Sequence, residues 1–420
     1  MKRSGAADLP LHYGYVPQWL ADRMARLGLA VTEALLADYG RDEVLRRLSD
    51  PFWFQSFGAV MGMDWHSSGI TTSVMGALKR AINPHSKELG IYICGGKGSA
   101  SRQAPAEILK VCESTGLDGV ELVRSSKLSA KVDNTVVQDG FQLYMHCFVL
   151  SREGQWTVIQ QGMSTGNSTA RRYHWHSAGL RSFVDDPHTA ICGPNQGEIL
   201  NLADHQADPA RKGVLSLTRE KPELMMQDAQ QLLTQPPPRT QDAQQFLTLP
   251  AHHDVRAEDV DLRRLGAVLW LAHDRRPADF EELVLLEGVG PRTLQSLALV
   301  SEVIHGTPAR FRDPARFAFA HGGKDGHPFP VPIDVYDETI AILQGAVHKA
   351  KVGESDKLDA MKKLSALAQR AEDSFAPTGR GLDEWIAREQ ADSWKYGGRT
   401  VFGKAKPPEA AVRSKQLRLF

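Results

Sequence analysis

The spacing of hydrophobic and polar positions predicts both helices and strands over the first half of the chain. Apolar residues recur at helical intervals over 31–50, whereas 140–150 and 154–163 are rich in strand-forming residues and are joined by the turn-like string SREG at 151–154. We therefore expect a mixed α/β domain with antiparallel strands over 1–215. Strict alternation along the first strand puts Gln142, Tyr144, His146 and Phe148 on one face and Phe141, Leu143, Met145 and Cys147 on the other.

A change in composition near residue 220 predicts the main domain boundary. The strings QDAQQLLTQPP and QDAQQFLTLPA, which begin at Gln227 and Gln241, nearly repeat one another and flank three consecutive prolines. Such a run of prolines cannot continue a helix, so 216–250 is predicted to be a linker in which short helices flank the prolines. Residues 251–370 then have helical spacing almost throughout, and 371–420 has the Gly, Pro and Lys content of a mobile tail. The predicted fold class is α+β, with an all-helical second domain.

Composition and charge narrow the classes of protein that fit. Lys+Arg and Asp+Glu are both 50, so the formal charge of +0 excludes a uniformly basic nucleic-acid coat but permits local basic patches. The four cysteines have no CxxC spacing, which excludes a disulfide framework and a cysteine-rich zinc site. The sequence has neither a long apolar run nor the apolar segment of a signal peptide, so we expect a cytoplasmic protein without a membrane span.

A short motif in the second half suggests contact with a nucleic-acid backbone. Within LEGVGPRT at 286–293, a helix is predicted to end before the GVG turn and another to begin at Pro291. The pattern resembles the helix-hairpin-helix of DNA repair enzymes, in which free amides at a helix start hold a phosphate. An ordinary helical hairpin is the alternative. The residues expected to bind DNA are Gly288, Gly290, Arg292 and Thr293.

A more specific resemblance is to the helix-hairpin-helix DNA glycosylases, whose hairpin is followed by a catalytic aspartate. In VPIDVYDETI at 331–340 that place is taken by Asp334 or Asp337. The interval from Gly290 is longer than in those enzymes, and Arg292 stands where bifunctional members carry a lysine. The alternative role for Asp334 is at the start of a helix, where aspartate is favoured.

The first half also contains many polar residues within apolar strings. Carboxylates and histidines can bind a divalent metal, Mg²⁺ or Mn²⁺, and activate water as in metal-dependent nucleases, while basic residues hold phosphate. None of these residues has a diagnostic spacing, so each has an alternative as a hydrogen-bonded structural group. The candidate catalytic residues are Asp64, His66, Asp133, Asp139, His146 and His174. The candidate phosphate-binding residues are Lys97, in a Gly-rich loop after a predicted strand, Arg171 and Arg172.

The end of the sequence resembles the pentapeptide by which bacterial proteins bind the sliding clamp. An extended basic tail would carry its apolar side chains into a groove of the clamp. A terminal segment that docks on its own domain is the alternative. The residues expected to bind the clamp are Gln416, Leu417, Leu419 and Phe420.

Several uncommon strings occur in one order along most of the chain. They include RSGAADLPLHYG at 3–14, GGKGSASR at 95–102, ARRYHW at 170–175 and FAFAHGGKDGHPFPV at 317–331. On these strings the chain resembles an uncharacterised bacterial and archaeal family, domain of unknown function seven hundred and sixty-three. The resemblance implies no established activity.

These patterns together predict a nucleoid-associated DNA-binding protein of DNA repair or maintenance. Its predicted partners are DNA and the sliding clamp, and its first half is predicted to hold a metal-dependent nuclease site. A DNA glycosylase that uses Asp334 and a non-catalytic adaptor between DNA and clamp are the two alternatives. The reaction products distinguish the two enzymatic hypotheses. A nuclease cleaves DNA strands and requires a metal, whereas a glycosylase leaves abasic sites and requires none.

Overall fold

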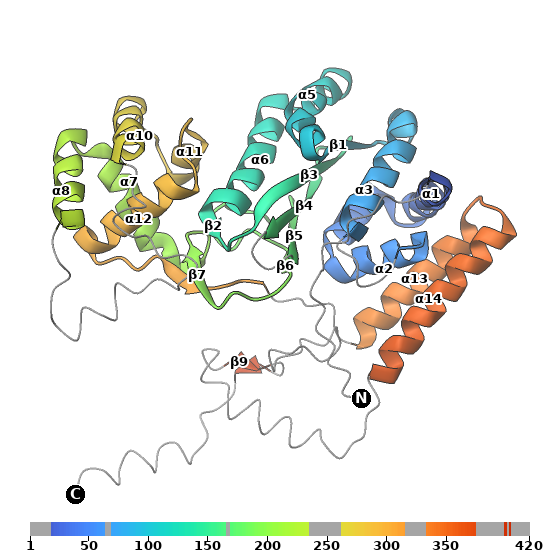
Figure 1. Ribbon diagram of the computed structural model, residues 1–420. Helices are drawn as coiled ribbons and strands as arrows, with labels where there is room; N and C mark the ends of the chain where they lie inside the picture. The colour runs from blue at the N-terminus through green and yellow to red at the C-terminus, as the bar shows by residue number, and fades with distance from the viewer. Residues whose placement is uncertain are drawn as a thin grey trace, which may run out of the picture.

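A five-stranded antiparallel sheet runs through the centre of the computed structural model (Figure 1). The structure describes residues 18–63, 69–164, 169–234, 262–315, 333–374, 399–400 and 403–404. The strand order is β1-β3-β4-β5-β6, and the bounds are Ile91–Lys97, Gln142–Ser151, Trp156–Ser164, Thr169–His176 and Ala190–Cys192. The predicted hairpin between β3 and β4 is confirmed, and in its turn Gly154 has φ +90°.

Helices cover both faces of this sheet, which therefore separates two hydrophobic cores (Figure 1). The core that contains α5 and α6 is called the first core here, and the core that contains α1, α2 and α3 is called the second core. Successive strand residues alternate between them, so Phe148 lies in the first core and Val149 in the second. The bounds are α1 Gln18–Ser49, α2 Pro51–Met61, α3 Gly69–Ile82, η1 Asn83–His85, α4 Ser86–Leu89, η2 Gly98–Gln103, α5 Ala104–Thr115 and α6 Gly119–Lys131.

The innermost helix is α2, all of whose residues are buried. Its sequence PFWFQSFGAVM is apolar on every side, which is the pattern of a helix surrounded by protein. Asp50 caps its start by accepting from Trp53 N at 2.8 Å, and Gly62 ends it in the left-handed conformation with φ +114°. Gln55 of this helix accepts from Arg172 of β5, so this polar side chain contacts the sheet and not water.

A second group of elements extends the first core on the side of α6. It consists of the antiparallel sheet β2-β7-β8 and a set of helices whose apolar residues join those of α5 and α6. The bounds are η3 Val132–Val136, β2 Val137–Gln138, β7 Glu198–Asn201, η4 His205–Ala207, α7 Asp208–Arg219, α8 Pro222–Thr234, α10 Leu262–Arg275, α11 Phe280–Leu285, α12 Pro291–His305 and β8 Arg310–Arg312. Residues 310–312 were predicted to be helical; they form a strand because β7 supplies an antiparallel partner.

The last two long helices, α13 (Ile333–Lys349) and α14 (Glu354–Ser374), belong to the second core and pack against α1 and α2. Helices from 251–370 are thus divided between the two cores. β9 (Arg399–Thr400) and β10 (Gly403–Lys404) pair with each other. None of the helices in these described ranges combines the length and apolarity needed to cross a membrane.

The structure describes only part of the predicted linker and of the predicted tail. The stretch 222–234 within the predicted linker forms α8, while 235–261 lies outside the described residues, as does most of 371–420. The chain is a mixed α and β protein with antiparallel sheets, as predicted.

One irregularity in β3 changes which of its residues share a face. The register shifts between Leu143 and Met145, so Tyr144 is an extra residue opposite β4. Leu143 packs against the first core and Tyr144 against the second. The predicted strict alternation is wrong here, because the bulge reverses the phase of the strand by one residue.

Candidate functional site

The polar residues predicted to form a catalytic site are distributed over both faces of the five-stranded sheet. Asp133, Asp139 and His146 contact the face toward α5 and α6, and His174 lies on the face toward α1 to α3. All four are buried. The sheet therefore separates His174 from the other three. Asp64 and His66 lie outside the described residues.

Asp133 lies in η3, a turn of π-helix that follows α6, and its side chain is fully buried. Its Oδ2 accepts from Trp175 Nε1 at 2.9 Å and from Gln160 Nε2, while Oδ1 contacts His188 Nε2. Burial raises the pKa of Asp133, and its contacts with His188, Trp175 and Gln160 oppose that rise. The carboxylate is thus held by three side chains of the protein.

His146 continues this network toward α6. Gln160 donates its amide nitrogen to Asp133, so its Oε1 faces His146 Nδ1 at 2.9 Å and that nitrogen carries the proton. His146 Nε2 then accepts from Ser126 Oγ at 2.8 Å. Burial lowers the pKa of His146 to about 4, so its imidazole is neutral at pH 7. His146 is therefore a neutral, fully hydrogen-bonded group of the core.

Asp139 belongs to a separate buried ion-pair network on the same face. Arg171 donates to Asp139 Oδ2 at 2.8 Å and to Asp313 Oδ2 at 2.6 Å, and Tyr173 donates to the same Asp139 oxygen at 2.6 Å. Arg171 also stacks on Phe141, 4.6 Å from the ring centroid. Burial raises the pKa of Asp139 against the effect of Arg171. Arg171 lies inside the protein, where it cannot hold the phosphate predicted for it.

The neighbouring arginine, Arg172, points into the second core. It donates to Gln55 Oε1 at 3.1 Å, to Thr71 Oγ1 at 3.3 Å and through Nε to His174 Nε2 at 2.8 Å. His174 therefore carries its proton on Nδ1, which donates to Leu48 O at 3.2 Å. Burial, followed by the charge of Arg172, holds the pKa of His174 well below its ordinary value. Arg172 is fully buried, so it too cannot reach the phosphate predicted for it.

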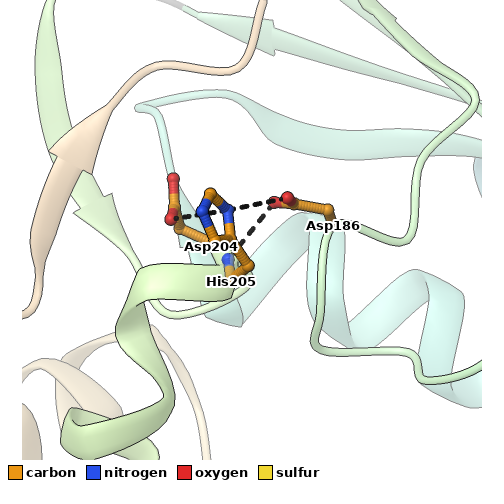
Figure 2. A group of neighbouring side chains, drawn as sticks. All are labelled: Asp186, Asp204 and His205. Atoms are coloured by element: carbon orange, nitrogen blue, oxygen red, sulfur yellow. Dashed lines mark hydrogen bonds and ion pairs between the residues drawn. The ribbon is translucent and has the colours of Figure 1, made fainter. Parts of the chain in front are cut away.

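One group in the described part of the chain has donor atoms close enough to hold a metal ion: Asp186, Asp204 and His205. Figure 2 shows the three side chains pointing toward one another, with the imidazole between the two carboxylates. His205 Nδ1 lies 2.9 Å from Asp186 Oδ2 and 3.5 Å from Asp204 Oδ1. Asp204 also accepts from Gln206 N at 2.8 Å as the N-cap of η4. These contacts account for the group as a hydrogen-bonded cluster at the surface.

The helices predicted around the GVG turn begin and end close to the expected positions. α11 ends at Leu285 and α12 begins at Pro291. Gly288 has φ +85°, a conformation that favours glycine. Val289 is buried in the first core, and Thr293 Oγ1 is 3.4 Å from Gly288 O, to which it donates. The local conformation predicted for LEGVGPRT is therefore present.

The carbonyl groups of this turn face the rest of the protein. Lys131 Nζ donates to Val289 O at 2.6 Å, and Gln138 Nε2 donates to Pro291 O at 2.8 Å. Burial lowers the pKa of Lys131. Gly290, the N-cap residue of α12, supplies no side-chain cap, and Arg292 is exposed. The first amides of α12 remain available to a ligand.

The first residues of the predicted Gly-rich loop, Gly95 to Lys97, lie within β1 instead of after it, and an ion pair between Lys79 and Glu107 holds Gly95. Lys79 Nζ donates to Gly95 O at 2.7 Å and to Glu107, while Glu107 Oε2 accepts from Gly95 N at 2.7 Å. A Cβ on Gly95 would lie 2.2 Å from His146 O, so close strand packing accounts for this glycine. Lys97 is exposed at the end of β1, 6.0 Å from the centroid of the Tyr144 ring.

The remaining predicted site residues lie away from the GVG turn or outside the described residues. Asp334 is near the start of α13, which belongs to the second core, whereas the turn belongs to the first. The structure does not bring this aspartate and the turn into one core. The residues predicted to bind the clamp, Gln416, Leu417, Leu419 and Phe420, lie outside the described residues.

The fold defines a mixed α and β protein in which a central antiparallel sheet separates two helical layers. Residues 5–331 match the family described as Protein of unknown function (DUF763). The match covers more than half of the chain, so the chain belongs to this family. Comparisons with curated proteins and with solved structures give no match.

Sequence reasoning missed three residues that complete these networks: His188, Asp313 and Gln55. Asp313 is 142 positions from Arg171, and Gln55 is 117 positions from Arg172. Local spacing carries no information about pairs so far apart. His188 has a weak local signal, as an isolated histidine in the polar string DDPHT between two strands.

Proposed function

We propose that the protein binds DNA through the phosphate backbone at the turn between α11 and α12. The observation that carries this proposal is the conformation of LEGVGPRT, in which a 15-residue helix starts at Pro291 without a capping side chain. No described residue accepts a hydrogen bond from the amides of Gly290, Arg292 or Thr293. Free amides at the positive end of a helix dipole bind an anion without reading the base sequence.

The surroundings of the turn also support this proposal. Lys131 and Gln138 donate hydrogen bonds to carbonyl groups of the turn. These bonds fix the loop and leave its amides without a partner. Arg292 is exposed beside them and adds a positive charge. A Cβ on Gly290 would meet nothing within 4 Å, and its φ of −124° suits any residue. The space next to the amides is therefore open.

Gly290→Glu tests DNA binding without disturbing the fold. The new side chain has room, but it places bulk and negative charge where a phosphate would approach. We expect affinity for short duplexes of unrelated sequence to fall about tenfold or more at fixed salt, equivalent to ~1.4 kcal/mol. The measurement is a fluorescence anisotropy titration.

The matched control is Gly76→Glu in α3, an exposed position where an added Cβ would also meet nothing within 4 Å. This helix belongs to the second core, on the other side of the sheet. The variant adds the same charge and should leave DNA affinity unchanged. Equal loss in both variants, or no loss in Gly290→Glu, would contradict binding at the turn.

We propose a second partner, the bacterial sliding clamp, for the last five residues. Leu417, Leu419 and Phe420 would bury apolar surface in a groove of the clamp. A peptide that ends in Gln416 to Phe420 should bind the clamp, and replacing Leu419 and Phe420 with Ala should weaken binding more than a hundredfold, roughly 3 kcal/mol. Calorimetry with both peptides measures this, and equal affinities would exclude the interaction.

The enzymatic alternatives remain predictions from the sequence. A Mg²⁺- or Mn²⁺-dependent nuclease would cleave strands, whereas a glycosylase that uses Asp334 would leave abasic sites without added metal. A non-catalytic adaptor would bind DNA and clamp and yield neither product. Incubation of labelled DNA with and without each metal distinguishes the three.

A further inference from the structure

The contact between Asp133 and His188 differs from the buried networks of His146 and His174 in one respect: it reaches the surface. Asp133 is fully buried in the π-helical turn η3, whereas the His188 side chain is 8% exposed. The imidazole packs against Trp175, with ring centroids 4.4 Å apart, and against Tyr173 at 6.2 Å. The carboxylate and the two aromatic rings hold the imidazole in one orientation.

The hydrogen bonds determine which ring nitrogen of His188 carries the proton. Trp175 and Gln160 both donate to Asp133 Oδ2, which leaves Oδ1 for His188 Nε2. The two hydrogen bonds donated to Oδ2 favour the carboxylate form of Asp133, so the proton between Oδ1 and His188 resides on Nε2 and points at Asp133. Nδ1 then has its lone pair free.

That second nitrogen is open to a ligand. His188 Nδ1 has no hydrogen-bond partner among the described residues. It is also absent from the set of fully buried polar atoms without a partner, so this nitrogen is accessible at the surface. The contrast is with His146 and His174, both of whose ring nitrogens are hydrogen-bonded inside the protein. Of these three histidines, His188 alone offers an unprotonated nitrogen at the surface.

We propose that Asp133 and His188 form a carboxylate–imidazole dyad whose Nδ1 accepts a proton from a bound water or hydroxyl ligand. The proton moves from the ligand O–H to Nδ1 and leaves an oxyanion on the ligand. The resulting imidazolium keeps its Nε2–H on the Asp133 carboxylate, which stabilises the positive charge. Asp133 is the positioning residue, and the hydrogen bonds from Gln160 and Trp175 orient it. The proposal does not depend on DNA binding at the α11–α12 turn.

Asp133→Asn tests the positioning role with almost no change in shape. The amide oxygen of Asn would take the place that accepts from Trp175 and Gln160, so its NH₂ group would face His188 Nε2. Nε2 would then have to accept, and the proton would move to Nδ1, the wrong tautomer for a proton acceptor.

The first measurement is ¹⁵N NMR of protein with labelled histidine, with His188 assigned by its loss in His188→Gln. We expect an unprotonated Nδ1 and a protonated Nε2 in the wild-type protein, and the reverse in Asp133→Asn. A protonated Nδ1 in the neutral wild-type imidazole would overturn the proposal. The wild-type spectrum requires only His188→Gln for its assignment. It therefore tests the position of the proton on His188 even if Asp133→Asn fails to fold.

The second measurement is acylation by diethylpyrocarbonate, which attacks accessible unprotonated imidazole nitrogens, followed by mass spectrometry. We expect His188 to react faster than buried His146, and its rate to fall roughly tenfold in Asp133→Asn because the outer nitrogen becomes protonated. His205, which is 55% exposed, is the internal control and should react equally in both proteins. Labelling of His188 no faster than that of His146 would overturn the dyad, because a purely structural pair would be closed to the reagent.

Discussion

Arg171 and Arg172 are consecutive in the sequence and equally buried, yet they lie in two different chemical environments. Arg171 faces the first core and bonds to the carboxylates of Asp139 and Asp313. Arg172 faces the second core, where its hydrogen bonds include those to Gln55, Thr71 and His174. Burial lowers the pKa of Arg172; burial acts the same way on Arg171, but its two carboxylates raise the pKa above the ordinary value. Alternation along a strand is the cause of this difference.

The comparison shows that one sheet can carry a charged network on one face and a network with neutral acceptors on the other. Around Arg171, two carboxylates and one guanidinium leave a formal surplus of one negative charge in a region closed to water. Tyr173 and the amides of Phe141, Gln196 and Ala315 donate to these carboxylates and spread that charge. Removing the cation should therefore have a larger effect than removing a neutral acceptor.

Arg171→Met should have the largest effect on stability. It leaves Asp139 and Asp313 buried without their cation, and breaking a buried ion pair on one side costs about 3–5 kcal/mol. Chemical denaturation of the folded protein measures the loss.

The control for this variant is Arg46→Met, which removes a surface ion pair with Glu43 and should change stability by about 0–1 kcal/mol. Adding Asp139→Asn and Asp313→Asn to Arg171→Met should restore part of the loss, because the uncompensated charges are then gone. Equal effects of Arg171→Met and Arg46→Met would show that the buried network contributes no more than a surface pair.

The next effect is a dependence of stability on pH that arises at His146. The folded protein holds the pKa of this imidazole at about 4, below the ordinary 6.5, because of burial. The unfolded chain therefore binds the proton first as the pH falls, and the folded state loses stability between pH 6.5 and about 4. The shift corresponds to roughly 3 kcal/mol over that interval.

His174 and His176 also have lowered pKa values, so they destabilise the folded state over the same pH range. The variant His146→Gln is needed to separate the contribution of His146 from theirs. The wild-type protein should lose more stability than His146→Gln between pH 6.5 and 4, as measured by denaturation at several pH values. Parallel curves for the two proteins would mean that His146 is not held neutral by the fold.

The sequence predicted the local parts of this structure and missed the pairings over long distances. The hairpin of β3 and β4 and the start of α12 at Pro291 follow from turn residues and helix-starting residues within a few positions. The contact of His188 with Asp133 spans 55 positions, and that of Asp313 with Arg171 spans 142. Such contacts depend on how the strands and helices pack, which no local spacing records.

The same limit explains why the candidate site was predicted only in part. Asp133, Asp139, His146 and His174 were chosen as polar residues within apolar strings, and they are indeed hydrogen-bonded groups of the core. Their separation by the sheet is a property of the tertiary fold. The bulge at Tyr144 adds a second uncertainty, since one extra residue reverses the face of every position before it in β3.

The smallest loss of stability should come from Thr71→Val, which removes one of the neutral acceptors of Arg172. Thr71 Oγ1 accepts from Arg172 Nη1 at 3.3 Å, and the same nitrogen also donates to Gln55 Oε1 at 3.1 Å. Valine has nearly the same shape, so the change removes one acceptor while Gln55 keeps the guanidinium hydrogen-bonded, and we expect a loss of about 0.5–1.5 kcal/mol.

Thr72→Val is the control on the same helix, because its hydroxyl bonds only to the helix carbonyl of Gly69 at 3.1 Å and its loss should be smaller still. Denaturation curves of both variants measure the difference. A loss from Thr71→Val as large as that from Arg171→Met would show that one neutral acceptor of Arg172 contributes as much as the cation between Asp139 and Asp313, and the distinction between the two networks would then be wrong.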